Sequence, residues 1–154
     1  MRCYRLRREQ WIPKALDEAF AFFARPQNLE EITPPFLRFH IVRAEGELHE
    51  GSLIEYRLRM RGLPMRWVSE ITEWEPPHKF VDTQLRGPYA LWRHQHLFAA
   101  EGSGTRIMDD VEYALPFGII GELAHTLLVR RDVERIFEYR RRKLEEMLAV
   151  PRRG

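Results

Sequence analysis

The chain has 154 residues, of which 44% are hydrophobic and 31% are charged. This composition excludes a disordered chain and fits one domain, residues 1–154, with enough apolar material for a core. The 25 basic and 23 acidic side chains leave a net charge of only +2, which argues against a nucleic-acid binder.

The single cysteine, Cys3, excludes an intrachain disulfide and favours a reducing compartment. Residues 1–11 are rich in arginine and contain no apolar run, which argues against a signal peptide. No stretch approaches the length of a membrane span. We therefore expect a cytoplasmic protein.

The first third of the chain predicts one strand and two short helices. Residues 2–12 alternate between apolar and charged side chains, as a half-buried strand does. Pro13 suits the first turn of a helix over residues 14–24. Asn28 is a candidate cap for a second short helix that ends at Pro34.

Six further strands are expected in quick succession, at residues 36–43, 52–61, 65–74, 79–86, 91–100 and 105–115. In the first of these, Leu37, Phe39 and Ile41 would share one face. The connections are short and rich in Gly and Pro, so neighbouring strands should be antiparallel.

The C-terminal part predicts one long helix over residues 119–148, about 45 Å in length. Its apolar stripe is expected to comprise Ile120, Leu123, Leu127, Val133, Ile136, Phe137, Leu144 and Met147. The basic runs 130–131 and 140–143 are interpreted as the solvated face, with glutamates between them. The whole order of elements is α+β.

The last hairpin carries the most local information. The four-residue loop Glu101–Gly104 would pair Phe98 with Ile107, His96 with Asp109, His94 with Val111 and Trp92 with Tyr113. This register turns His94, His96 and Asp109 to the same inner face, and Asp82 is a candidate to join them from the neighbouring strand. Since buried polar groups need partners, this cluster favours a partly wet cavity over a solid core.

Short motifs over nearly the whole chain form a recognisable set: Gln10-Trp11-Ile12-Pro13, Ile32-Thr33-Pro34-Pro35, Trp74-Glu75-Pro76-Pro77, Gly87-Pro88-Tyr89, Trp92-Arg93-His94-Gln95-His96-Leu97-Phe98 and Leu115-Pro116. This set resembles the START-like, helix-grip (SRPBCC) superfamily of polyketide cyclase/dehydrase and lipid-transport type, and its bacterial cyclase/dehydrase or cell-division-inhibitor-like subgroup. The resemblance implies a curved seven-stranded antiparallel sheet wrapped around the C-terminal helix, with a hydrophobic pocket between them. It implies no shared catalytic residues.

The main hypothesis is binding of a small, mostly apolar ligand, such as a lipid, a sterol or a polyketide, between the sheet and the long helix. The expected ligand-binding residues are Tyr56, Leu58, Met60, Trp67, Asp82, Trp92, His94, His96, Phe98, Val111 and Tyr113. The alternative is a cyclase or dehydratase in which His96, oriented by Asp109, is the general base.

The His94-x-His96 pattern is also compatible with a metal site, with Asp82 or Asp109 as a third ligand. Cavity histidines held by acids and water are the preferred interpretation, so no metal and no cofactor are expected. The expected partner is a small apolar molecule, with no nucleic acid and no membrane span, for a monomer or a homodimer.

Overall fold

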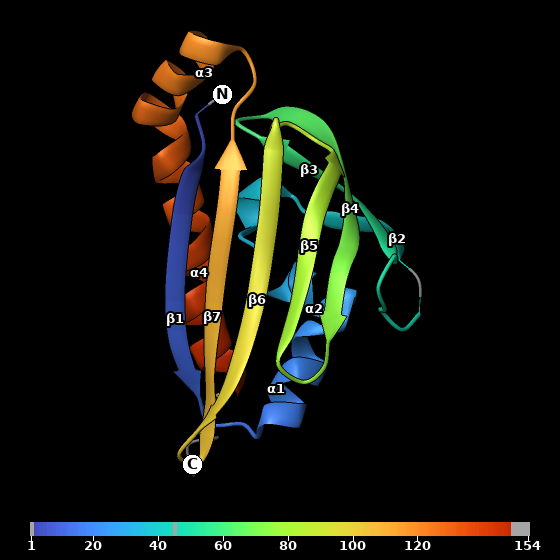
Figure 1. The fold of residues 1–154 in the computed structure, drawn as a ribbon. Helices are drawn as coiled ribbons and strands as arrows, with labels where there is room; N and C mark the ends of the chain where they lie inside the picture. The colour runs from blue at the N-terminus through green and yellow to red at the C-terminus, as the bar shows by residue number, and fades with distance from the viewer. Residues whose placement is uncertain (1, 45, 149–154) are drawn as a thin grey trace.

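The computed structural model of the chain describes residues 2–44 and 46–148. Within them, seven strands form one antiparallel sheet in the order β1-β7-β6-β5-β4-β3-β2 (Figure 1). The strands are β1 (Tyr4–Ile12), β2 (His40–Ala44), β3 (Leu53–Met60), β4 (Leu63–Glu75), β5 (Lys79–Arg86), β6 (Leu91–Glu101) and β7 (Gly104–Ala114). The predicted number of strands and their antiparallel pairing are confirmed.

Helices cover only one face of this sheet (Figure 1). Two short helices, α1 (Leu16–Phe23) and α2 (Pro26–Glu31), follow β1, and a 3₁₀ turn, η1 (Pro35–Leu37), precedes β2. A C-terminal helix of 31 residues comprises α3 (Gly118–Ala124), a π-helical turn η2 (His125–Val129) and α4 (Arg130–Leu148). The expected α+β helix-grip fold is therefore confirmed.

Two local predictions near the second helix are wrong. The strand expected at 36–43 begins only at His40, because Pro35 starts the η1 turn and Arg38 adopts a left-handed φ of 47°. Asn28 does not cap α2; its side-chain amide donates to the Phe22 carbonyl at 2.8 Å, and Pro26 occupies the first turn.

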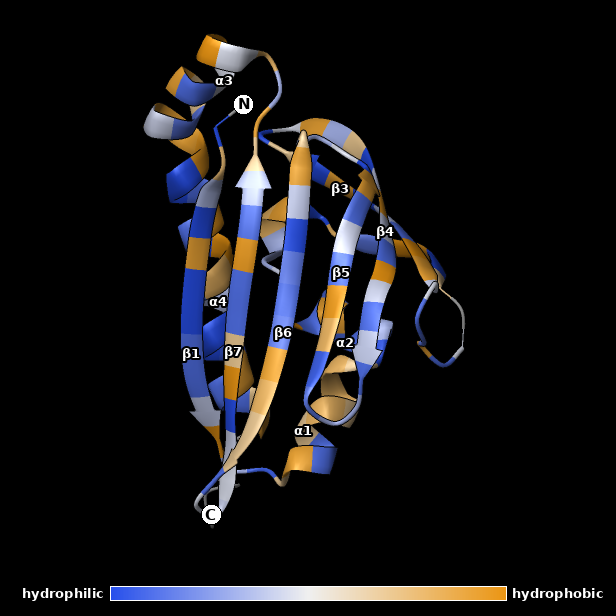
Figure 2. Cartoon of the chain, viewed as in Figure 1, coloured by the Kyte–Doolittle hydropathy of each residue, from blue (hydrophilic) through white to orange (hydrophobic). Residues whose placement is uncertain are grey.

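The sheet curves because its strands are interrupted by β-bulges. The register shifts between Val68 and Ser69 and again between Ile71 and Glu73, both where β4 pairs with β5. A bulge bends its strand and increases the local twist. Along the strands hydrophilic and hydrophobic residues alternate, as the blue and orange bands of Figure 2 show, so the sheet has one buried face.

The last hairpin has the predicted register, including His96 opposite Asp109 and Trp92 opposite Tyr113. Its inner face packs toward α4, whose buried stripe comprises Val133, Phe137, Arg140, Leu144 and Leu148. None of the helices that the structure describes is long and apolar enough to cross a membrane.

The N-terminal part of the predicted helical stripe is wrong. Ile120, Leu123 and Leu127 are 75%, 60% and 63% exposed, so they do not face the sheet. The inner positions of this segment are instead Gly121 and His125, which are buried. The π turn explains the change of face, since one additional residue rotates the following turns by about 100°.

Candidate functional site

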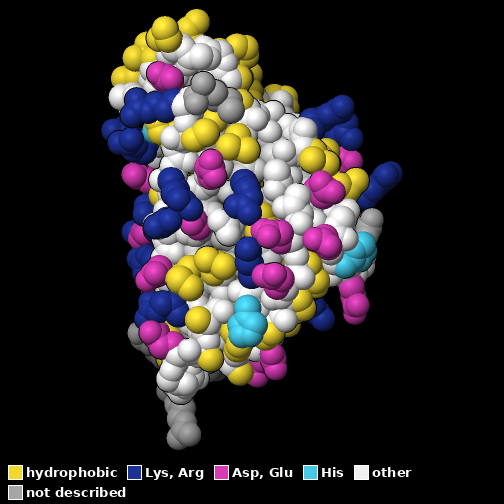
Figure 3. Space-filling model, in the orientation of Figure 1, with side chains coloured by type: hydrophobic (Ala, Val, Ile, Leu, Met, Phe, Trp, Pro, Cys, Tyr) yellow, Lys and Arg dark blue, Asp and Glu magenta, His cyan; other side chains and the backbone are white. Residues whose placement is uncertain are grey.

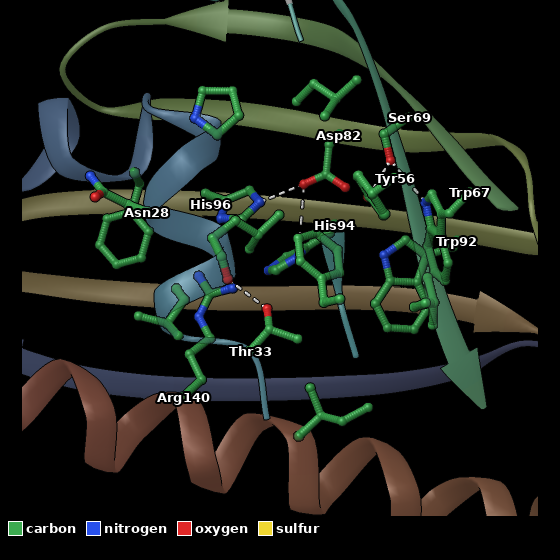
Figure 4. Close-up of a pocket in the computed structure, with 18 of the residues that line it drawn as sticks. Asn28, Thr33, Tyr56, Trp67, Ser69, Asp82, Trp92, His94, His96 and Arg140 are labelled. Carbon is green, nitrogen blue, oxygen red and sulfur yellow. Dashed lines mark hydrogen bonds and ion pairs between the residues drawn. The ribbon is translucent and has the colours of Figure 1, made fainter. Parts of the chain in front are cut away.

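A cavity of about 160 Å³ lies between the sheet and the helices α1, α2 and α4. Its wall is mostly aliphatic and aromatic, and it reaches the surface near the exposed Arg25. Figure 4 shows Asp82, His94 and His96 grouped in the middle of the wall, with Trp67 and Trp92 to one side. Such a wall, apolar with few convergent polar groups, is typical of a small-molecule site.

Eight of the residues expected to bind ligand line this cavity: Tyr56, Leu58, Met60, Trp67, Asp82, Trp92, His94 and His96. The other three belong to the core behind it. Phe98 packs against the rings of Phe20 and Phe23, Val111 is fully buried, and the Tyr113 hydroxyl bonds to His125 Nε2 at 2.8 Å.

The two histidines stack on each other, with ring centroids 3.7 Å apart, and each bonds to a different carboxylate. His96 Nε2 lies 2.6 Å from Asp82 Oδ2, and His94 Nε2 lies 2.7 Å from Asp109 Oδ1. Asp109 is directly opposite His96 in the strand register, yet their nearest ion-pair distance is 3.8 Å. The hydrogen bonds run diagonally because the long imidazoles lean along the strand to the next partner.

The expected catalytic pairing of His96 with Asp109 therefore differs from the observed contacts. His96 takes Asp82, on the other neighbouring strand, as its hydrogen-bond partner. Asp109 does not line the cavity. Its role is to accept the hydrogen bond from His94.

Arg140, which was expected on the solvated face of the long helix, is instead a buried member of the site. It is only 7% exposed, and its guanidinium donates to Asp109 Oδ1 at 3.1 Å. The same group lies over the rings of Phe23 and Phe137, at 5.2 and 5.7 Å from their centroids. Its spacing from Val133 and Phe137 places it on the buried stripe of α4, and that spacing is the signal that identifies it. The neighbours Arg141 and Arg142 do pair with glutamates at the surface, as predicted.

Electrostatics fix the protonation of this cluster. Burial acts to raise the pKa of Asp82 and of Asp109, but hydrogen bonds from the histidines and the charge of Arg140 outweigh it, so both pKa values are lowered. Burial, with the neighbouring His94, lowers the pKa of His96 to about 4. At neutral pH both carboxylates are thus ionised and His96 is neutral, donating from Nε2 to Asp82.

A buried acceptor remains in the cluster. With its proton on Nε2, His96 carries a lone pair on Nδ1, and this atom is buried without a hydrogen-bond partner among the described residues. Arg140 Nε, which is a donor, is likewise buried without a hydrogen-bond partner among the described residues. Unpaired buried polar atoms are costly, which makes this end of the cavity receptive to a polar group or to water.

A second polar group lies beside the indoles. Ser69 is almost fully buried, and its hydroxyl accepts from Trp67 Nε1 at 2.9 Å and bonds to the Tyr56 hydroxyl at 2.8 Å. Burial raises the pKa of Tyr56, which keeps its phenol neutral. These bonds fix Trp67 and Tyr56 as rigid parts of the wall.

Asp82, His94 and His96 are also the residues that could hold a metal ion. Each offers one ligand atom, and these atoms lie within 4.8 Å of one another. A cation there would have to replace the proton between His96 and Asp82 and would sit near the charge of Arg140. The donor set suits zinc, but the contacts already present satisfy most of it.

A curved sheet that grips a long helix over an apolar cavity defines the class of helix-grip ligand-cavity proteins. The sequence profile described as "Polyketide cyclase / dehydrase and lipid transport" matches residues 12–137. The chain therefore belongs to this family, which supports binding of hydrophobic ligands in general terms. No curated protein sequence matches the chain.

Solved structures share the fold over nearly the full length. The protein TTHA0849 from Thermus thermophilus has 24% identity and a TM-score of 0.69, with 93% of this chain and 95% of that chain covered. Ginseng major latex-like protein 151 from Panax ginseng has 15% identity and a TM-score of 0.70, with 96% and 99% covered. CV1439 from Chromobacterium violaceum has 11% identity and a TM-score of 0.74, again with 96% and 99% covered.

Proposed function

We propose that this protein binds a small, mostly aromatic molecule that presents a hydrogen-bond donor, such as a phenolic hydroxyl, to Asp82 and His96. The observation that carries the proposal is the group of Asp82, His94 and His96 in the wall of a mostly apolar cavity, with Asp109 hydrogen-bonded to His94 outside the lining. Apolar burial supplies most of the affinity, and the polar cluster orients the ligand.

Size limits the ligand. A volume of about 160 Å³ is close to that of an engineered apolar protein cavity of about 150 Å³ that binds benzene. The enclosed part thus takes one or two rings, and a larger polyketide or sterol would extend through the opening near Arg25.

The charge of the polar cluster limits the choice of ligand further. The cluster sets two ionised carboxylates against one guanidinium, and His96 is neutral. A ligand carboxylate would meet the Asp82 charge in a poorly screened site, whereas a hydroxyl can donate to it. We therefore expect neutral donors to bind better than anions of the same shape.

The test is calorimetric titration with 1-naphthol and 1-naphthoate, which share a ring system and differ in the polar group. The naphthol should bind at least tenfold more tightly, and Asp82→Asn should reduce this ratio. Glu73→Gln, on the outer face, is the control and should leave the ratio unchanged. Equal affinities for both compounds, or no binding of either, would refute the proposal.

A cyclase or dehydratase is the second candidate, supported by the short His96–Asp82 hydrogen bond at the cavity wall. His96 would be the base through Nδ1, with Asp82 and not Asp109 as the carboxylate that orients it. A pKa of about 4 makes it a weak base at neutral pH, where a general base works best with a pKa near 7. This is why we prefer binding.

Mass spectrometry separates the two candidates. Bound polyketide-like compounds should be recovered unchanged after incubation. Loss of one water, or ring closure, that disappears in His96→Ala would establish the enzyme instead.

A further inference from the structure

A cluster of exposed aliphatic and aromatic side chains covers one end of the molecule. We call it the apolar cap: Phe117, Ile119, Ile120, Leu123, Leu127 and Leu128, which are 81%, 83%, 75%, 60%, 63% and 43% exposed. Figure 3 shows hydrophobic side chains gathered at this end, over α3. Single exposed hydrophobic residues are ordinary, but a contiguous patch of six marks an interaction site.

The inner contacts of this helix hold the cap outward. An added Cβ at Gly121 would lie 2.1 Å from the Pro116 carbonyl oxygen, so the helix backbone rests directly on the end of the sheet. One turn later, the His125 ring stacks on the Tyr4 ring, with centroids 3.4 Å apart, and forms a hydrogen bond with the Tyr113 hydroxyl. The helix cannot roll to bury its aliphatic face without breaking these contacts.

The residue just before α3 also holds its side chain outward. Phe117 adopts a left-handed φ of 73°, which is uncommon for a bulky side chain, and still projects into solvent. Strained backbone of this kind is kept where it serves a function. The cap is thus a built feature of the fold, and none of its six residues lines the ligand cavity.

Charge indicates what covers the cap. Arg130 and Arg131 follow η2 directly, and Arg2 lies 5.4 Å over the ring of Tyr4, beside His125. All three are exposed, and none makes an ion pair with a described residue. Glu122 is the only acidic residue between 115 and 131. An apolar surface with a basic border is complementary to an anionic lipid surface.

Shape favours the same occupant. The α3 segment projects beyond the ends of β1 and β7, so the cap is a narrow, convex end and not a flat face (Figure 1). A convex apolar helix can enter the headgroup layer of a bilayer without spanning it. We propose that the apolar cap docks this protein on anionic membrane surfaces, with Arg2, Arg130 and Arg131 contacting the lipid headgroups.

The test is co-sedimentation with vesicles of 30% phosphatidylglycerol in phosphatidylcholine, compared with pure phosphatidylcholine. The protein should bind the anionic vesicles, with at least tenfold weaker binding to neutral ones and a loss of binding in high salt. Arg130→Gln and Arg131→Gln should each weaken anionic binding by roughly fivefold.

The double variant Ile120→Ser/Leu123→Ser should reduce vesicle binding more than tenfold and leave the unfolding transition unchanged, because both residues are exposed. Leu63→Ser is the matched control. This leucine is exposed to a similar degree, 63%, but lies at the start of β4, so the variant should bind vesicles like the parent. If the double variant binds as well as the parent, the proposal is wrong.

A second copy of the chain is the competing occupant. A dimer in light scattering that the double variant converts to a monomer, without vesicle binding by the parent, would overturn the membrane proposal. None of these readouts depends on the ligand of the cavity, so this proposal and the proposed function can fail separately.

Discussion

Arg140 and Asp109 form the most constrained pair at the residue scale. Their side chains are 9% and 13% exposed, and the carboxylate also accepts from His94. Taking two charges out of water is costly, and only their mutual contacts offset that cost. The pair is therefore more important for the shape of the cavity wall than as a source of net stability.

Replacing Arg140 with Leu should destabilise the protein by about 3–5 kcal/mol, because it leaves the Asp109 charge buried without its counter-ion. Adding Asp109→Asn should recover part of that loss, since the uncompensated charge is removed while His94 keeps an acceptor. Urea unfolding of the single and double variants measures the difference. Arg142→Leu, at the surface, should cost less than about 0.5 kcal/mol; a similar cost for both arginines would contradict this view of the cluster.

The lowered pKa of His96 predicts how the stability of the protein depends on pH. This pKa is about 4 in the folded protein and 6.5 in an unfolded chain, so the unfolded state binds more protons between these values. The contribution of His96 to the free energy of unfolding is complete above pH 6.5 and is lost as the pH falls toward 4. We expect a loss of about 2 kcal/mol between pH 7.5 and 5.0. The lowered pKa values of Asp82 and Asp109 add a further loss in more acidic solution.

Unfolding experiments at pH 7.5 and 5.0 measure this loss. His96→Gln has no imidazole to titrate, so its free energy of unfolding should change much less between the two pH values. His78→Gln, at an exposed position, is the control and should keep the full dependence. An unchanged pH dependence in His96→Gln would show that other groups cause it.

At the element scale, the end of β1 closes over the β6–β7 turn. Trp11 Nε1 donates to the Glu101 carbonyl at 2.9 Å. An added Cβ at Gly104 would lie 2.2 Å from the Ile12 carbonyl oxygen and 2.5 Å from the Trp11 ring. Only glycine allows β1 and β7 to approach so closely at this corner.

Gly104→Ala should therefore destabilise the fold by about 1–3 kcal/mol through overpacking. Gly46→Ala is a matched control, because no atom of the residues that the structure describes lies within 4 Å of its added Cβ, and it should change stability by less than about 0.5 kcal/mol. Thermal unfolding followed by circular dichroism distinguishes them. Equal melting temperatures for the two variants would rule out the close contact.

At the scale of the whole molecule, the cavity lies where the sheet curves away from the helix. Side chains of β3, β4, β5 and β6 line it from the sheet, and side chains of α1, α2 and α4 line it from the helices. A molecule bound there contacts most of the elements at once, so its binding should stabilise the whole fold.

With 1-naphthol at 100 times its dissociation constant, we expect a gain of about 2.7 kcal/mol in the free energy of unfolding. Met60→Trp fills part of the cavity and should abolish this gain. Met108→Trp, on the outer face of β7, should respond like the parent protein. A thermal shift assay compares the three, and a full response of Met60→Trp would place the ligand elsewhere.

The sequence by itself determined the number of strands, the antiparallel pairing of the later strands, the long helix and the hairpin register, because these depend on local alternation and short turns. It also predicted which face His94, His96 and Asp82 share. The tertiary structure alone decided which carboxylate each imidazole contacts, because a diagonal hydrogen bond depends on how side chains lean between strands. It alone also placed Ile120 at the surface, since a π turn changes the face of a helix without a clear sign in the sequence.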